Sequence, residues 1–211
     1  TACPMSIGSV QTQFFHLDHA FPLESGDSFD SITLAYETYG TLNSDASNAI
    51  LVFHALTGSQ HAAGINESVP GVAPLWTSES VVGWWDAFIG PGKALDTERY
   101  FVICANYLGG CYGSTGPRST NPLTGKPYGS QFPQVSAWDV IRSQLSLLDA
   151  LGIDCLHAAI GGSLGGMLSI LLATRCPHRV KNVLPIATGL ETTVLHRVHN
   201  FEQILAIRND P

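Results

Sequence analysis

The order of hydrophobic and polar positions predicts strands in the first half of the chain and alternating strands and helices in the second. Runs rich in β-branched and aromatic residues at 31–39, 48–54 and 100–106 are typical of strands. The 100–106 run, YFVICAN, is apolar almost throughout, which suits a strand buried on both faces of a parallel sheet. We expect two further strands at 155–160 and 180–187.

Three segments between and after these strands are expected to be helical. The first follows Ser136, a good N-cap residue, carries apolar residues at helical spacing and ends at Gly152. The second helix is expected over residues 164–174 and the third over residues 191–207. Because strands and helices alternate, the pattern predicts an α/β fold with a largely parallel sheet.

Two long stretches, residues 57–82 and 109–135, show no clear element. Loops of this length are usually functional or covered by another part of the protein. The second stretch holds four prolines, which favour a fixed conformation over a mobile one. The length of 211 residues fits one domain, and we take residues 1–211 as a single α/β core.

Charge and cysteine content narrow the classes of function. The formal charge of −7, without any cluster of Lys or Arg, disfavours a nucleic-acid partner. The five cysteines are widely spaced and form no C-x-x-C pair, which disfavours a metal site and favours reduced thiols in the cytoplasm. No apolar run reaches the ~18 residues of a membrane helix, and no signal peptide is visible. We therefore expect a cytoplasmic protein without a membrane partner.

The pentamer GGSLG at residues 161–165 carries the candidate chemistry. G-x-S-x-G is a weak pattern alone, but here it follows an apolar strand and precedes a helix, as a nucleophile elbow does. At such a turn the serine has a strained backbone, and small neighbours such as Gly162 and Gly165 let the strand and the helix approach closely. The helix N-terminus also favours developing negative charge. We predict that Ser163 is the catalytic nucleophile.

An oxyanion hole is the second element of such a site. Its donors in this fold are the N–H of the residue after the nucleophile, here Leu164, and an N–H from the loop after the third strand. The sequence HALTG at residues 54–58 occupies that place, and Leu56 is the candidate second donor. His54, Thr57 and Gly58 would shape the site. The alternative for Leu56 is that its side chain only lines the core.

The pentamer GGCYG at residues 109–113 is a competing candidate, because Cys111 could also act as a nucleophile. The residues that follow it, STGP, cannot begin a regular helix, so the elbow geometry fails. We interpret this pentamer as a tight loop near the site. His54 and His61 flank the candidate oxyanion loop, and we interpret each as a buried, hydrogen-bonded structural histidine.

Several longer motifs run through nearly the whole chain. They are 34–40 (LAYETYG), 54–58 (HALTG), 83–86 (GWWD), 89–93 (IGPGK), 96–101 (DTERYF), 108–111 (LGGC), 113–117 (GSTGP), 127–129 (PYG) and 161–167 (GGSLGGM). In content and order they resemble the homoserine O-acetyltransferase family of α/β-hydrolase acyltransferases. The resemblance implies the α/β-hydrolase fold, a mostly parallel sheet flanked by helices.

The resemblance also implies an activity. Ser163 would take the acetyl group of acetyl-CoA, a co-substrate, and pass it to the hydroxyl of homoserine in methionine biosynthesis. No metal and no permanently bound cofactor would be needed, the other partners would be small-molecule substrates, and the full-length protein would be a homodimer. The alternatives are a serine or homoserine O-succinyltransferase, a serine esterase of the same fold, and a scaffold without activity.

One departure from the family pattern concerns the rest of the catalytic triad. In the family the triad Asp and His follow at positions beyond residue 211, together with the last sheet strands and most of the helical lid. We therefore expect neither triad partner in this chain, and we expect the 211 residues alone to be inactive. Ile204 also stands where the family commonly has an Arg.

Overall fold

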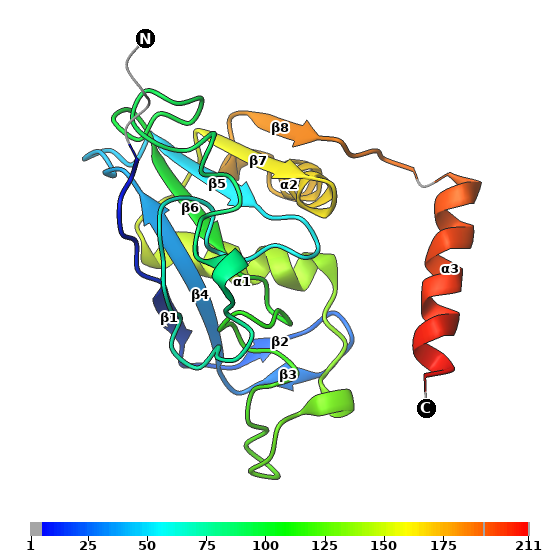
Figure 1. The fold of residues 1–211 in the computed structure, drawn as a ribbon. Helices are drawn as coiled ribbons and strands as arrows, with labels where there is room; N and C mark the ends of the chain where they lie inside the picture. Colours follow the sequence, from blue (N-terminus) through cyan, green and yellow to red (C-terminus); the bar gives the residue numbers. More distant parts are fainter. Residues whose placement is uncertain (1–5, 192, 211) are drawn as a thin grey trace.

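A six-stranded sheet forms the centre of the computed structural model, which describes residues 6–191 and 193–210 (Figure 1). The strand order is β1-β4-β6-β5-β7-β8, antiparallel from β1 to β6 and parallel from β6 to β8. The strands are β1 (Gln13–Leu17), β4 (Ile32–Tyr39), β6 (Phe101–Ala105), β5 (Ala49–Phe53), β7 (Ala158–Gly162) and β8 (Val183–Ile186). The predicted α/β class with a largely parallel sheet is confirmed.

The predicted strands β4, β5 and β6 are each confirmed to within one residue at either end. The prediction for β7 was wrong at both ends, because the strand begins at Ala158 and continues through Gly161 and Gly162. The predicted strand at 180–187 is confirmed in its middle as β8. Strand β1 and a small hairpin of β2 (Phe21–Pro22) and β3 (Ser28–Phe29) were not predicted from the sequence.

The three predicted helices are present as α1 (Ala137–Ala150), α2 (Leu164–Arg175) and α3 (Val194–Arg208). Ser136 caps α1 as expected: its hydroxyl accepts the Asp139 N–H, and the Asp139 carboxylate accepts the Ser136 N–H. The two long loops contain only the short 3₁₀ helices η1 (Ser78–Ser80) and η2 (Gly129–Gln131), and a third, η3 (Pro177–Arg179), follows α2.

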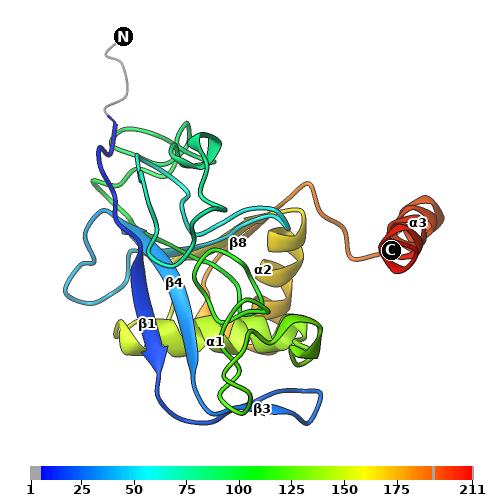
Figure 2. The same ribbon diagram turned by 60° about the horizontal axis from the view of Figure 1, so that its bottom comes forward.

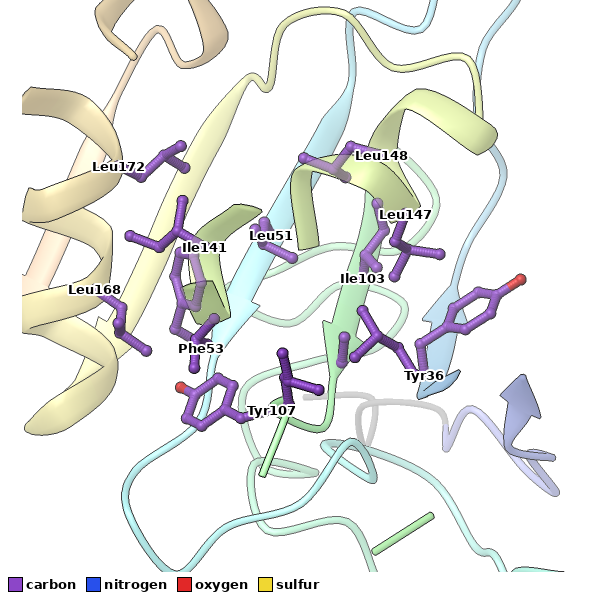
Figure 3. Packing of buried hydrophobic residues seen from close by; sticks show 14 of the residues in the cluster. Tyr36, Leu51, Phe53, Ile103, Tyr107, Ile141, Leu147, Leu148, Leu168 and Leu172 are labelled. Atoms are coloured by element: carbon purple, nitrogen blue, oxygen red, sulfur yellow. The ribbon is translucent and has the colours of Figure 1, made fainter. Parts of the chain in front are cut away.

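Helices α1 and α2 pack on one face of the sheet and form the larger part of the core (Figure 3). Side chains from the sheet and from both helices meet there: Leu51, Phe53, Ile103, Ile141, Leu147, Leu148, Leu168 and Leu172. The segment between β5 and β6, which includes the first long loop, covers the opposite face, where Ala62, Ala63 and Ile89 pack against Val52. The first long loop is therefore a structural layer.

Helix α3 stands away from the rest of the protein at the end of an extended connection (Figures 1 and 2). None of its described side chains is buried. Its exposed apolar residues are Val194, Leu195, Val198, Phe201, Ile204, Leu205 and Ile207. Across residues 6–191 and 193–210, no helix has the length and hydrophobicity needed to span a membrane.

Candidate active site

Ser163 lies at the turn between β7 and α2, in the position predicted for the nucleophile. Its φ of 54° and ψ of −116° fall in a region that non-glycine residues rarely adopt. The turn is fixed on both sides: the Ser163 N–H donates to the Ile186 carbonyl of β8, 3.0 Å away, and its own carbonyl accepts from Gly166 and Met167. The side chain is exposed at the first turn of α2.

Two glycines make the close approach of strand and helix possible. A Cβ on Gly165 would lie 2.1 Å from the Phe53 carbonyl oxygen, and a Cβ on Gly161 would lie 2.2 Å from the Gly165 carbonyl carbon. The expectation that Gly162 must also be small was wrong, because a Cβ there would meet no atom within 4 Å. The first turn of α2 therefore packs against the end of β5.

The loop at residues 54–58 begins at this contact. A tight turn, closed by the Gly58 N–H donating to the Ala55 carbonyl at 2.9 Å, has Leu56 and Thr57 at its centre. The Leu56 side chain is 78% exposed, so the alternative that Leu56 only lines the core is wrong. Gly58 is required for space, because a Cβ there would lie 2.8 Å from the Cβ of His54.

His54 and Tyr107 support the start of this loop. Their rings are stacked with centroids 3.7 Å apart, and the Tyr107 hydroxyl donates to the His54 carbonyl at 2.5 Å. The His54 Nδ1–H donates to the Ala55 carbonyl at 2.7 Å. Burial lowers the pKa of His54 to about 4, although the Ala55 hydrogen bond opposes the shift. His54 is thus buried and hydrogen-bonded, as we expected, and it is neutral.

A buried hydrogen-bond network centred on Glu37, which the sequence did not predict, holds residues 60–62, just after the loop at 54–58. Glu37 is fully buried on β4, and its carboxylate accepts from Thr12, Tyr39, His61 and Asn66 at 2.7–2.8 Å. Glu37 is the one charged residue in the strand sequence ITLAYETY, and this was the signal in the sequence. His61 is the hydrogen-bonded structural histidine that we expected.

Both ring nitrogens of His61 face acceptors. Nδ1 is 2.8 Å from the Glu37 carboxylate and Nε2 is 3.0 Å from the Val81 carbonyl, so the ring donates from both and is an imidazolium. Burial alone would lower the pKa of His61, but the hydrogen bond and charge of Glu37 raise it. Burial would raise the pKa of Glu37, but the hydrogen bond and charge of His61 lower it.

Two cavities adjoin the elbow and share no lining residue. The larger, of about 700 Å³, is lined by the loop at 54–58, by the segment after β6, by the start of α1, and by Leu164 and Leu168 of α2. The smaller, of about 550 Å³, is lined by Ser163, by residues of the connection to α3 such as Glu191, and by His196 of α3 itself. Leu56 and Leu164, the two candidate oxyanion donors, line the larger cavity together.

Cys111, the competing nucleophile, lies near the elbow, whereas no histidine–carboxylate ion pair lines the cavity of Ser163 in the described part of the chain. Cys111 is an exposed free thiol that lines the larger cavity, and residues 114–117, directly after its pentamer, form no helix, as expected. In the described part of the chain, the one histidine–carboxylate ion pair is His61–Glu37, which does not line the cavity of Ser163. The same residues contain no group of three or more His, Cys, Asp or Glu able to hold a metal ion.

The strand order, the elbow at Ser163 and the loop after β5 define the class of protein, and the comparison with family models agrees. Residues 48–205 match the family described as "alpha/beta hydrolase fold", and the chain belongs to this family. Within it, the chain matches the N-terminal part of proteins named homoserine O-acetyltransferase, at 43–49% identity.

Two curated relatives illustrate this match. The homoserine O-acetyltransferase of Moorella thermoacetica is 48% identical over 205 residues, which is 97% of this chain and 52% of the relative. The homoserine O-succinyltransferase of Saccharophagus degradans is 43% identical, over 98% of this chain and 52% of the relative. The chain thus spans about half the length of the curated relatives it matches.

Solved structures give the same picture. The homoserine O-acetyltransferase of Bacillus anthracis has 37% identity and a TM-score of 0.83, with 96% of this chain and 53% of that one covered. Esterase E22 has 35% identity and a TM-score of 0.82, with 95% and 54% covered. Acyltransferases and esterases therefore share this half of the fold.

Proposed function

We propose that the protein transfers an acetyl group from acetyl-CoA to the hydroxyl of L-homoserine through an acyl-Ser163 intermediate. The observation that carries the proposal is the backbone of Ser163, held at positive φ in a strand-to-helix turn beside the loop that bears Leu56. The similarity to homoserine O-acetyltransferases suggests the substrates.

Two half-reactions complete the transfer. The Ser163 Oγ bonds to the thioester carbonyl carbon, the C–S bond breaks, and the serine proton passes to the departing coenzyme A thiolate. The homoserine oxygen then bonds to the same carbon, the Ser163 ester bond breaks, and the proton of the acceptor hydroxyl returns to Ser163. In both, the Leu56 and Leu164 N–H groups would bind the oxyanion, where one donor is typically worth about 2.7–4 kcal/mol.

The proton needs a general base. The family resemblance assigns this role to a histidine beyond residue 211, oriented by an Asp.

The described cysteines are free thiols, which supports a cytoplasmic setting. A homodimer of the full-length protein follows from the resemblance alone.

Release of free coenzyme A by the full-length protein tests the proposal. We expect release that depends on L-homoserine, with formation of O-acetylhomoserine, and a loss of about 10⁴-fold or more in Ser163→Ala. Mass spectrometry should find the acetyl group on Ser163 when homoserine is left out. The 211-residue chain alone should show no turnover, because the family resemblance places the base beyond residue 211. Equal turnover by Ser163→Ala would contradict the proposal.

A serine esterase is the second candidate, because esterase E22 matches this chain nearly as well as the acetyltransferase structure does. The same assay separates the two functions. An esterase would release acetate at a rate that does not respond to homoserine, whereas a transferase would release little acetate until the acceptor is added.

A further inference from the structure

The larger cavity beside the elbow is free of charged side chains. No Asp, Glu, Lys or Arg is among its described lining residues, and its walls are mostly apolar, with Leu108, Phe132 and Val140 among them. Its volume of about 700 Å³ lies within the usual range of small-molecule sites. An acetyl group, with two carbons, would leave most of this space unused.

The polar groups in the wall are uncharged. His54 is neutral at physiological pH, and its Nε2 is buried without a hydrogen-bond partner. The amide nitrogen of Asn106, which also lines the cavity, is likewise buried and unpartnered. A negatively charged ligand would find no cationic partner among these side chains.

The helix N-terminus at the cavity does not offer a binding site for a negatively charged ligand either. Ser136 and Ala137, at the start of α1, line the cavity, and a helix start is a common site for anions. Here the position is already filled: the buried Asp139 carboxylate caps the helix, and the Ser136 hydroxyl donates to Glu24 at 2.6 Å. Arg142 is held by Asp139 at 2.5 Å.

The larger cavity also lies next to both candidate oxyanion donors, Leu56 and Leu164. Gly165 packs on the Phe53 and His54 carbonyls, which brings the first turn of α2 against the loop that bears Leu56. A carbonyl oxygen bound by the Leu56 and Leu164 N–H groups would therefore direct its acyl substituent into the cavity that both residues line. The smaller cavity at Ser163, with Glu191 and His196, remains for the polar substrate groups.

We propose that the larger cavity is an acyl-binding pocket for uncharged acyl groups, which accepts straight chains longer than acetyl and rejects dicarboxylic groups such as succinyl. The inference rests on the proposed acyl transfer and adds the class of acyl donor. A carboxylate buried without a cation is strongly disfavoured, whereas additional methylene groups gain apolar contact.

Butyryl-CoA and succinyl-CoA form a matched pair, because both acyl groups have four carbons and only succinyl carries a second carboxylate. With the full-length protein and homoserine, we expect kcat/KM for butyryl-CoA within about tenfold of acetyl-CoA, and for succinyl-CoA at least about tenfold below butyryl-CoA. A succinyl-CoA value equal to or above that of butyryl-CoA would overturn the proposal.

A cation placed in the pocket should reverse the preference. Ala137 is an exposed lining residue, so Ala137→Lys adds a charge there without changing the core. We expect the ratio of succinyl-CoA to butyryl-CoA efficiency to rise about tenfold in Ala137→Lys. It should stay constant in Ala137→Gln, which is neutral, and in Ala150→Lys at the far end of the same helix. An unchanged ratio in Ala137→Lys would count against the pocket.

Esters without coenzyme A distinguish failure of this inference from failure of the proposed function. Acylation of Ser163 is measured with 4-nitrophenyl butyrate and 4-nitrophenyl hydrogen succinate in the same variants. A preference for butyrate that Ala137→Lys reverses would support the pocket even if every acyl-CoA were inactive, which would contradict only the proposed function. Absence of reaction with both ester and thioester donors would overturn both.

Discussion

Ser163 holds a backbone conformation that costs about 1–3 kcal/mol and persists only where its surroundings fix it. Those surroundings are the hydrogen bond from its N–H to β8 and the glycine contacts of the elbow. The sequence predicted the turn because the G-x-S-x-G pattern is local, whereas the contacts that fix it with Ile186 of β8 and Phe53 of β5 form only in the folded chain. The prediction failed for Gly162, because the pattern does not report which glycine faces a neighbour.

Gly165 and Gly162 provide a matched test of the elbow. Gly165→Ala would push a Cβ against the Phe53 carbonyl, so we expect a loss of about 1–3 kcal/mol in the free energy of unfolding, together with a loss of Ser163 acylation. Gly162→Ala has open space and should change stability by less than about 1 kcal/mol. Urea unfolding followed by circular dichroism measures both. Equal costs would contradict the packing described for the elbow.

The Glu37–His61 pair makes stability depend on pH in a direction that follows from its pKa shifts. Because the folded pKa of His61 is raised above 6.5, its contribution is complete below pH 6.5 and is lost as the pH rises through the folded value. Because the folded pKa of Glu37 is lowered below 4.5, its contribution is lost as the pH falls through that folded value. The pair should stabilise the fold most between these limits.

Glu37→Gln tests this dependence. Breaking a buried pair typically costs about 3–5 kcal/mol, so the variant should be less stable at pH 6, and its stability should not show the fall above pH 6.5 that we expect for the unmodified chain. Urea unfolding from pH 5 to pH 9 gives both curves. Parallel curves would mean that His61 is not the titrating group. The sequence could not predict this pair, because its members lie 24 residues apart and meet only in the folded protein.

At the scale of elements, the buried strands were predictable because burial on both faces requires continuous apolar runs. Strand β1 was missed because it is a partly exposed edge strand without such a run. The end of β7 was misplaced because Gly161 and Gly162 give no strand signal, although they extend its pairing with β8. The bounds of helix α1 were predicted well, since the N-cap residue Ser136 is recognisable in the sequence.

Ser136→Ala measures that cap. The substitution removes the hydroxyl that accepts the Asp139 N–H and should cost about 1 kcal/mol of unfolding free energy. Ser146, in the interior of the same helix, provides the control: its hydroxyl bonds back to the Arg142 carbonyl, and Ser146→Ala should be neutral or slightly stabilising. A larger loss at Ser146 than at Ser136 would contradict the capping.

At the scale of the whole molecule, apolar surface is concentrated on the β8 side. Leu184 and Ile186 of the edge strand β8 are about half exposed, and the apolar side chains of α3 lie in solvent. Exposed strand edges and large apolar patches promote association. The sequence predicted helix α3 but could not predict that it would lie apart from the sheet.

We expect the 211-residue chain to self-associate as its concentration rises. Light scattering after size-exclusion chromatography should show a mass that increases with concentration. The double variant Leu195→Glu with Phe201→Glu should reduce the association, whereas Leu123→Glu, a highly exposed apolar residue in a distant loop, should not. A concentration-independent monomer would show that these surfaces do not drive contact between copies.

The position of Cys111 gives the larger cavity a chemical reporter. Its thiol is exposed on the cavity wall, whereas Cys104 is fully buried and Cys155 and Cys176 are partly covered. A small alkylating reagent should therefore modify Cys111 first among these four. The rate of that modification, followed by peptide mass mapping, will slow when a molecule fills the cavity and will stay constant when it binds elsewhere. The alkylation rate of the Cys111 thiol thus reports whether the larger cavity is occupied, without turnover and without a labelled ligand.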